Sequence, residues 1–102
     1  MSFTNKDNLH DWFMYLYEQR ADDNGFVKCF ECGRNMHMSF YIGNTMCYSH
    51  LLEKSRYPQY AGDPNNVVIT HPECHHLYSM KPKEAINQYT RMKELKLKYN
   101  IS

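Results

Sequence analysis

The sequence predicts a small α+β domain in which a central finger of short strands is flanked by a helix at each end. Three observations lead to this fold class. Apolar residues recur at helical spacing near both ends of the chain, the middle holds short runs of β-forming residues, and two closely spaced Cys/His pairs bracket that middle. With 102 residues, the chain has the length of a single domain.

The first helix and its closing turn are expected within residues 1–25. Its apolar face is a stripe at helical spacing, formed by Leu9, Trp12, Phe13, Leu16 and Tyr17. Thr4 and Asp7 have the spacing of a capping box at its start, and the turn-forming run 22–25 ends it. We expect the aromatic stripe to belong to the core, although the same stripe could supply the interface of a homodimer.

The finger itself is expected over residues 26–80. Two runs of β-forming residues, 36–42 and 45–50, are separated by Gly43-Asn44, which predicts a hairpin between them. The rest of the finger follows in chain order: a loop over 51–65, the strongest strand over 66–70, and a short helical turn from His75.

A second helix is expected over residues 81–102, with Pro82 in its first turn. Its apolar face would consist of Ala85, Tyr89, Met92, Leu95 and Tyr99. Residues 79–102 hold six Lys or Arg against two Glu, whereas residues 1–25 hold five acidic residues against two basic ones. The formal net charge of +1 is therefore an average. The basic segment could face nucleic acid, but charge alone favours a solvated helix face.

The composition excludes several classes of protein. Hydrophobic residues make up 42% and charged residues 23%, a balance that argues against disorder. No apolar run approaches the roughly 20 residues of a membrane span, and the N-terminus lacks the layout of a signal peptide. We therefore expect a cytoplasmic protein with no membrane partner. A domain of this size buries only a small core and is often helped by disulfides or a metal.

Cysteine and histidine spacing predicts a metal site. Cys29-x-x-Cys32 and His71-x-x-Cys74 resemble two zinc knuckles, meaning tight turns from which two ligands reach one ion. Together they supply three thiols and one imidazole, a set that Zn²⁺ accepts readily. A disulfide framework would need an oxidising compartment, and a redox C-x-x-C would need a strand-then-helix context. A structural zinc ion is therefore the favoured interpretation.

Other residues near the knuckles have structural interpretations. Gly33 would let the chain turn away from the metal after the first knuckle. Glu31 and Glu73 are expected at exposed positions inside the two turns. Cys47 has no partner at ligand spacing, so we expect a buried, apolar cysteine there.

Between and after the knuckles lie Ser49-His50, Asn66 and His75. With these residues the chain resembles the HNH endonucleases, which are built on the ββα-metal (His-Me) finger. The family pattern is a knuckle, a strand ending in His, a loop, an Asn opening the second strand, a second knuckle and a His after its last Cys. All these features occur in order over residues 29–78. The resemblance implies a zinc-stapled ββα-metal finger that acts as a metal-dependent DNA endonuclease.

The resemblance implies catalytic roles for His50, Asn66 and His75. His50 matches the general base that deprotonates a water attacking the phosphate, a task suited to an imidazole that titrates near neutrality. Asn66 matches the residue that braces the loop carrying the base or, in some members, reaches the metal. His75 matches a ligand of the catalytic ion, expected to be Mg²⁺ or Mn²⁺.

The chain departs from the family pattern at the residue before the base. The family has Asp or His there as a second metal ligand, whereas this chain has Ser49, whose hydroxyl is a poorer ligand. Asn66, Ser49, His76 and Asp63 are candidates to complete the catalytic metal site. The layout is similar to phage recombination nucleases of the lambda Nin-region type and to phage junction-resolving endonucleases. For a phage protein, the expected location is the bacterial host cytoplasm.

Basic residues around the presumed base are candidates for binding DNA. Lys54 and Arg56 follow His50, and Lys81 and Lys83 open the basic last segment. Such residues contact phosphates and carry little sequence selectivity, so we expect selection of a branched or junction DNA. Lys54 and Arg56 could equally be solvated loop charges. The alternative function is a non-catalytic zinc finger that binds nucleic acid or a protein.

Overall fold

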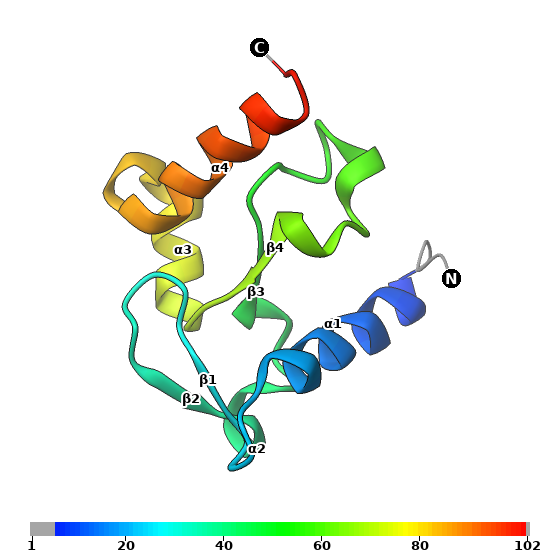
Figure 1. The fold of residues 1–102 in the computed structure, drawn as a ribbon, viewed down its shortest axis with the longest axis vertical. Coiled ribbons are helices and arrows are strands. Elements are labelled where there is room, and N and C mark those ends of the chain that lie inside the picture. The colour runs from blue at the N-terminus through cyan, green and yellow to red at the C-terminus, as the bar shows by residue number, and fades with distance from the viewer. Residues whose placement is uncertain (1–5, 102) are drawn as a thin grey trace.

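The computed structural model describes residues 6–101, which form two antiparallel strand pairs surrounded by helices (Figure 1). The helices are α1 (Lys6–Arg20), α2 (Met38–Tyr41), α3 (Pro72–Met80) and α4 (Ile86–Lys98). The strands are β1 (Phe26–Lys28), β2 (Asn35–His37), β3 (Tyr48–His50) and β4 (Val67–Ile69). The small α+β class is confirmed. No helix within residues 6–101 has the length and apolar character needed to cross a membrane.

Helix α1 forms as its apolar stripe predicts. Trp12, Phe13, Leu16 and Tyr17 are buried, and the ring of Phe13 stacks on Tyr48 of β3 with the centroids 4.6 Å apart. After the helix, the carboxylate of Asp22 accepts hydrogen bonds from the backbone N–H groups of Asn24 and Phe26. The predicted turn at 22–25 is thereby confirmed. The capping box involves Thr4, which lies outside the described residues.

The predicted hairpin between residues 36–42 and 45–50 is wrong. β2 pairs with β1 across the first knuckle, so that Val27 lies opposite Met36. Residues 38–41 form α2, because the His37 ring caps that turn by accepting the N–H of Ser39. Asn44 in turn caps a 3-10 turn over Thr45–Cys47. These side-chain caps favour helical turns over continued strands in this segment.

Strand β3 pairs instead with β4, as the register of Ser49 with Val68 shows. Figure 1 shows this pair between α1 on one side and α4 on the other. Successive residues of a strand face opposite ways. Val67 and Ile69 therefore pack with the core residues of α1, whereas Val68 packs with Leu95 of α4. The strand predicted over 66–70 is confirmed, shorter by one residue at each end.

Two helices begin at other residues than predicted. Helix α3 starts at Pro72 rather than His75, so the second knuckle is its N-terminal cap and first turn. Pro82 lies in a separate 3-10 turn, Pro82–Glu84, and α4 starts at Ile86. The apolar face predicted for the last helix is confirmed, since its members are buried or half-buried.

Arg20, the last residue of α1, binds the outer edge of β4. Its guanidinium donates hydrogen bonds to the carbonyl oxygens of Val67, at 2.7 Å, and Pro64, at 2.8 Å. A guanidinium carries several donors in a fixed plane, which lets one side chain reach two carbonyls. The end of α1 is thus fixed to the start of β4.

Candidate functional site

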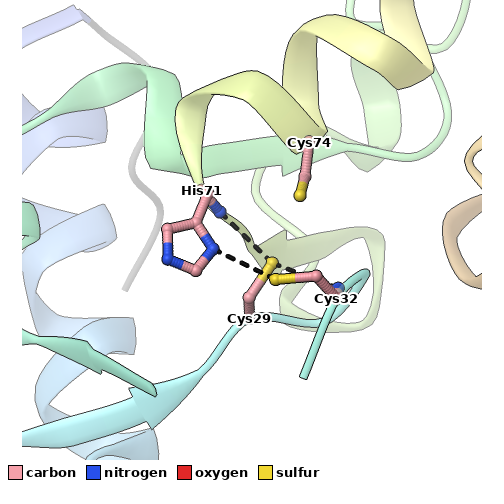
Figure 2. A group of neighbouring side chains, drawn as sticks. All are labelled: Cys29, Cys32, His71 and Cys74. Atoms are coloured by element: carbon pink, nitrogen blue, oxygen red, sulfur yellow. Dashed lines mark hydrogen bonds between the residues drawn. The ribbon is translucent and has the colours of Figure 1, made fainter. Parts of the chain in front are cut away.

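The four knuckle residues converge on one point (Figure 2). Cys29 and Cys32 come from the loop after β1, His71 is the N-terminal cap of α3, and Cys74 lies in its first turn. Their donor atoms all lie within 4.8 Å of one another. Tetrahedral zinc with bonds of about 2.3 Å to sulfur requires donors about 3.8 Å apart, so these residues fit such an ion.

Hydrogen bonds to sulfur support this cluster. The Sγ atom of Cys29 accepts the backbone N–H of Cys32 at 3.5 Å and that of His71 at 3.3 Å. The Cys32 Sγ lies 3.3 Å from His71 Nδ1 and 3.5 Å from Nε of Arg34. Burial raises the pKa of Cys32. Hydrogen bonds with Arg34, Cys29 and His71 outweigh this effect and lower the pKa to about 6. Such donors stabilise the thiolate, the form that binds metal.

Burial is the main influence on the pKa of two further thiols, Cys74 and Cys47. Burial, with the hydrogen-bonded thiol of Cys29, raises the pKa of Cys74 to about 12. A bound cation would favour its thiolate, because metal binding releases the proton of a ligand thiol. Cys47 lies in the core with no exposed surface, and burial raises its pKa to about 11. The prediction of a buried, apolar Cys47 is confirmed. Gly33 turns the chain at a φ of +79°, as expected for glycine after a knuckle.

His50, the last residue of β3, lines a pocket and binds the backbone through one ring nitrogen. Its Nε2 lies 2.9 Å from the carbonyl oxygen of Ala61. Because a carbonyl only accepts, Nε2 carries the proton and Nδ1 keeps its lone pair. The ring of Phe13 lies 5.6 Å away, and burial lowers the pKa of His50 below its ordinary value of 6.5. His50 is therefore held in the neutral form that a general base needs.

His75 in α3 lines the same pocket and binds the backbone through its other ring nitrogen, Nδ1. Its Nδ1 donates to the carbonyl oxygen of Met46 at 2.9 Å, which leaves the lone pair of Nε2 free. Metal-binding histidines commonly donate their second N–H to a carbonyl in this way. One pocket is thus lined by two histidines, and each binds a backbone carbonyl through a different ring nitrogen.

The pocket between these histidines is open and has a volume of about 620 Å³. Lys54, Arg56 and Lys96 line it, with Glu53 as the opposing charge. Phosphate groups are favoured by such a surplus of positive charge. Lys54 and Arg56 are predicted from the sequence as DNA-binding residues, whereas Lys96 is not. Its position on the same face of α4 as Tyr89 and Met92 was a signal for it.

Several predicted site residues lie outside this pocket. Ser49 is fully buried and donates its hydroxyl to Oε1 of Gln88 at 2.7 Å. Because β3 turns successive side chains to opposite faces, Ser49 points away from His50, and we withdraw it as a metal ligand. The exposed side chain of His76 and the carboxylate of Asp63, which accepts the Tyr99 hydroxyl, are likewise not among the lining groups.

Lys81 and Lys83 are exposed and do not line the pocket. The ammonium of Lys81 lies 3.7 Å from the carboxylate of Glu84. Both lysines lie in or beside the turn that precedes α4, whereas the cations of the pocket come from the loop after β3 and from α4 itself. Their contact with DNA stays a prediction.

Asn66 braces the loop that follows His50. Its Oδ1 accepts the N–H of Leu52 at 2.7 Å, and its Nδ2 donates to the carbonyls of Leu52 and Tyr60, each at 3.1 Å. The side chain is fully buried and lies outside the pocket, so the structure favours the brace over a metal ligand. This geometry matches the first of the two roles that the resemblance implied.

We expect Asn66→Ala to lower the free energy of unfolding by about 3 kcal/mol, because three hydrogen bonds, two of them buried, lose their shared partner. Urea denaturation of the metal-loaded protein measures this loss. The exposed neighbour provides the control, since Asn65→Ala should cost less than about 1 kcal/mol. Equal losses for both variants would contradict the brace.

Comparison with known proteins adds no relative. No family model, curated protein or solved structure matches the chain. The site therefore rests on its own geometry, which combines a Cys₃His cluster able to hold a metal ion with a basic pocket that receives two histidines.

Proposed function

We propose that this protein is a zinc-containing, metal-dependent DNA endonuclease of the HNH type. The observation that carries the proposal is that two histidines line one basic pocket and use different ring nitrogens to bind the backbone. His50 offers Nδ1 and His75 offers Nε2, while a backbone carbonyl holds the other nitrogen of each ring. A structural finger alone has no need of this arrangement.

In the proposed reaction, His50 accepts a proton from the water that attacks the scissile phosphate. Burial favours its neutral form, so the base is available at neutral pH. His75 would hold a catalytic Mg²⁺ or Mn²⁺, which supplies charge stabilisation at the phosphate and the leaving oxygen when bound. Asn66 keeps the loop after His50 in place through the backbone of Leu52 and Tyr60.

A separate Zn²⁺ would be bound by Cys29, Cys32, His71 and Cys74. Four protein donors close a tetrahedral site and leave no position for water, which is typical of structural zinc. This site joins the loop between β1 and β2 to the start of α3, and it therefore holds two distant parts of the chain together. Its proposed role is structural.

DNA would bind to the pocket through the phosphates of its backbone. Lys54, Arg56 and Lys96 surround the histidines and can pair with the backbone on both sides of the scissile bond. The rings of Tyr57 and Tyr89 also line the pocket, and aromatic rings can stack on unpaired bases. These features support a branched or junction DNA as the substrate class.

The alternative is a non-catalytic zinc finger that binds nucleic acid or a protein. One observation favours it: Ser49 is turned into the core, so His75 lacks the second family ligand beside it. Phosphate oxygens and waters would then have to complete the coordination of the ion, as they often do for Mg²⁺.

A nicking assay distinguishes the two functions. We expect the protein to nick supercoiled plasmid with Mg²⁺ or Mn²⁺ and to stop when EDTA is added. His75→Ala should reduce nicking by about 100-fold, because the catalytic ion loses its protein ligand. His76→Ala is the matched control, since it removes an exposed imidazole one residue away and should retain the parent rate. Plasmid that stays supercoiled with either ion would favour the non-catalytic finger.

A further inference from the structure

The first knuckle contacts the start of α4, 56 to 57 residues further along the chain. The carboxylate of Glu31 accepts the backbone N–H of Asn87 through Oε2 and that of Gln88 through Oε1, each at 3.0 Å. Asn87 also donates its Nδ2 to the carbonyl oxygen of Glu31 at 2.8 Å. The exposed position expected for Glu31 is wrong, because these contacts leave it half-buried.

Glu31 supplies what α4 lacks in its own sequence. Ala85 caps the helix without a side-chain hydrogen bond, and its first turn has no acidic residue. A helix start presents unpaired N–H groups and a partial positive charge, both of which a carboxylate satisfies. Here the carboxylate comes from between two metal-site cysteines, Cys29 and Cys32.

Gln88 extends this contact into the finger. Its side chain has no exposed surface, and Nε2 donates to the carbonyl oxygen of Cys74 at 3.1 Å and to Glu31 at 3.3 Å. Its Oε1 accepts the hydroxyl of Ser49 at 2.7 Å. Ser49 precedes His50 and Cys74 precedes His75, so Gln88 binds the backbone or side chain next to each pocket histidine.

Helix α4 also forms one wall of the pocket, through Tyr89, Met92 and Lys96. Lys96 lies eight residues after Gln88, which is about 12 Å along the helix. Leu95 packs in the core and would hold the second half of α4 even if the first turn were released. Loss of the N-terminal contact should therefore tilt the wall of the pocket rather than detach the helix.

We propose that Glu31 and Gln88 are positioning residues that align α4 along the pocket, so that the metal knuckle sets the affinity for DNA. This inference rests on the proposed function, because it assumes that the pocket binds DNA. Neither residue lines the pocket, and each acts through the placement of Tyr89 and Lys96.

Paired glutamate variants test this proposal. Glu31→Ala and Glu94→Ala each remove one carboxylate near α4, and Glu94 is an exposed residue that contacts Arg91. Electrostatics alone predicts tighter DNA binding for both variants, because each adds one positive charge. A positioning role predicts instead that Glu31→Ala raises Kd and KM for a branched oligonucleotide by about 10-fold. This fold-change corresponds to the free energy of one lost helix cap.

The same variants separate positioning from general damage. In Glu31→Ala we expect kcat within about two-fold of the parent and zinc content unchanged, and Glu31→Gln, which keeps one acceptor oxygen, should rescue part of the affinity. Binding as tight as the parent, or a kcat that falls as much as KM rises, would overturn the proposal. A parent protein that binds no DNA would instead refute the proposed function.

Amide hydrogen exchange of the parent needs no variant and no DNA. The N–H groups of Asn87 and Gln88 should exchange as slowly as that of Gly33, which donates to Cys29 inside the knuckle. We also expect removal of the metal with a chelator to accelerate all three together. Rapid exchange at Asn87 and Gln88 in the metal-loaded protein would show a frayed helix start and refute the positioning role.

Discussion

Replacing His50 with alanine is expected to slow DNA nicking by about 10²–10⁴-fold, the usual contribution of a general base. Among the described residues, the hydrogen-bond partner that the ring would lose is one backbone carbonyl, that of Ala61. His50 is also not one of the four metal-site donors. The variant should therefore retain the parent's zinc content and its cooperative unfolding.

The measurement is the initial rate of plasmid nicking at saturating Mg²⁺ or Mn²⁺, with zinc content and circular dichroism recorded on the same sample. His76→Ala again provides the matched control, because it removes an imidazole outside the pocket. If His50→Ala nicks plasmid as fast as the parent, His50 is not the base. A variant that loses both zinc and fold would be uninformative, so His50→Gln, which keeps a polar side chain, is measured beside it.

Loss of Cys74, one of the four donors of the proposed zinc site, is expected to abolish cooperative folding. Structural zinc contributes about 10–16 kcal/mol of binding free energy in finger peptides, which equals or exceeds the net stability of a typical small domain. Two of the four donors lie in the loop after β1 and two at the start of α3, so an ion bound there would hold non-local parts of the finger together. Cys74→Ala should therefore contain no zinc and show no cooperative thermal transition.

Cys47→Ala is the matched control for this experiment. Cys47 is equally a cysteine and more deeply buried, but it belongs to the core and not to the metal cluster. We expect this variant to keep one zinc per chain and to lose about 1–2 kcal/mol, the effect of a small cavity. Elemental analysis and thermal melting decide the outcome. A zinc-free Cys74→Ala protein that melts like the parent would refute a structural role for the metal.

The features that sequence predicts well here are local. The two knuckles depend on ligands three residues apart, and the apolar faces of α1 and α4 depend on helical spacing. Residues close together in the sequence decide such patterns, and distant contacts do not alter them. The Cys₃His cluster could be predicted because each knuckle needs only a tight turn and the two knuckles together supply the donors for one ion.

The features that were missed depend on distant parts of the chain. The turn residues Gly43-Asn44 predict a hairpin that would pair β3 with the preceding segment. The partner of β3 is instead β4, because side-chain caps fold the intervening segment into helical turns. The place of Ser49 before His50 makes it a candidate metal ligand, yet its hydroxyl donates to Gln88, 39 residues later. Glu31 contacts α4 across 56 to 57 residues, and no local pattern carries that information.

The contact between Arg20 and β4 determines which part of the chain would have to be transferred with the finger to another protein. The outer carbonyls of β4 are both occupied, that of Val67 by Arg20 and that of Ile69 by the N–H of Phe30. A fragment that began at residue 26 would lack Arg20 and expose the Val67 carbonyl at a strand edge, which invites pairing with other chains. Grafting this finger onto another protein would therefore require α1 as an edge cover, even though the Cys₃His cluster and both pocket histidines lie outside that helix.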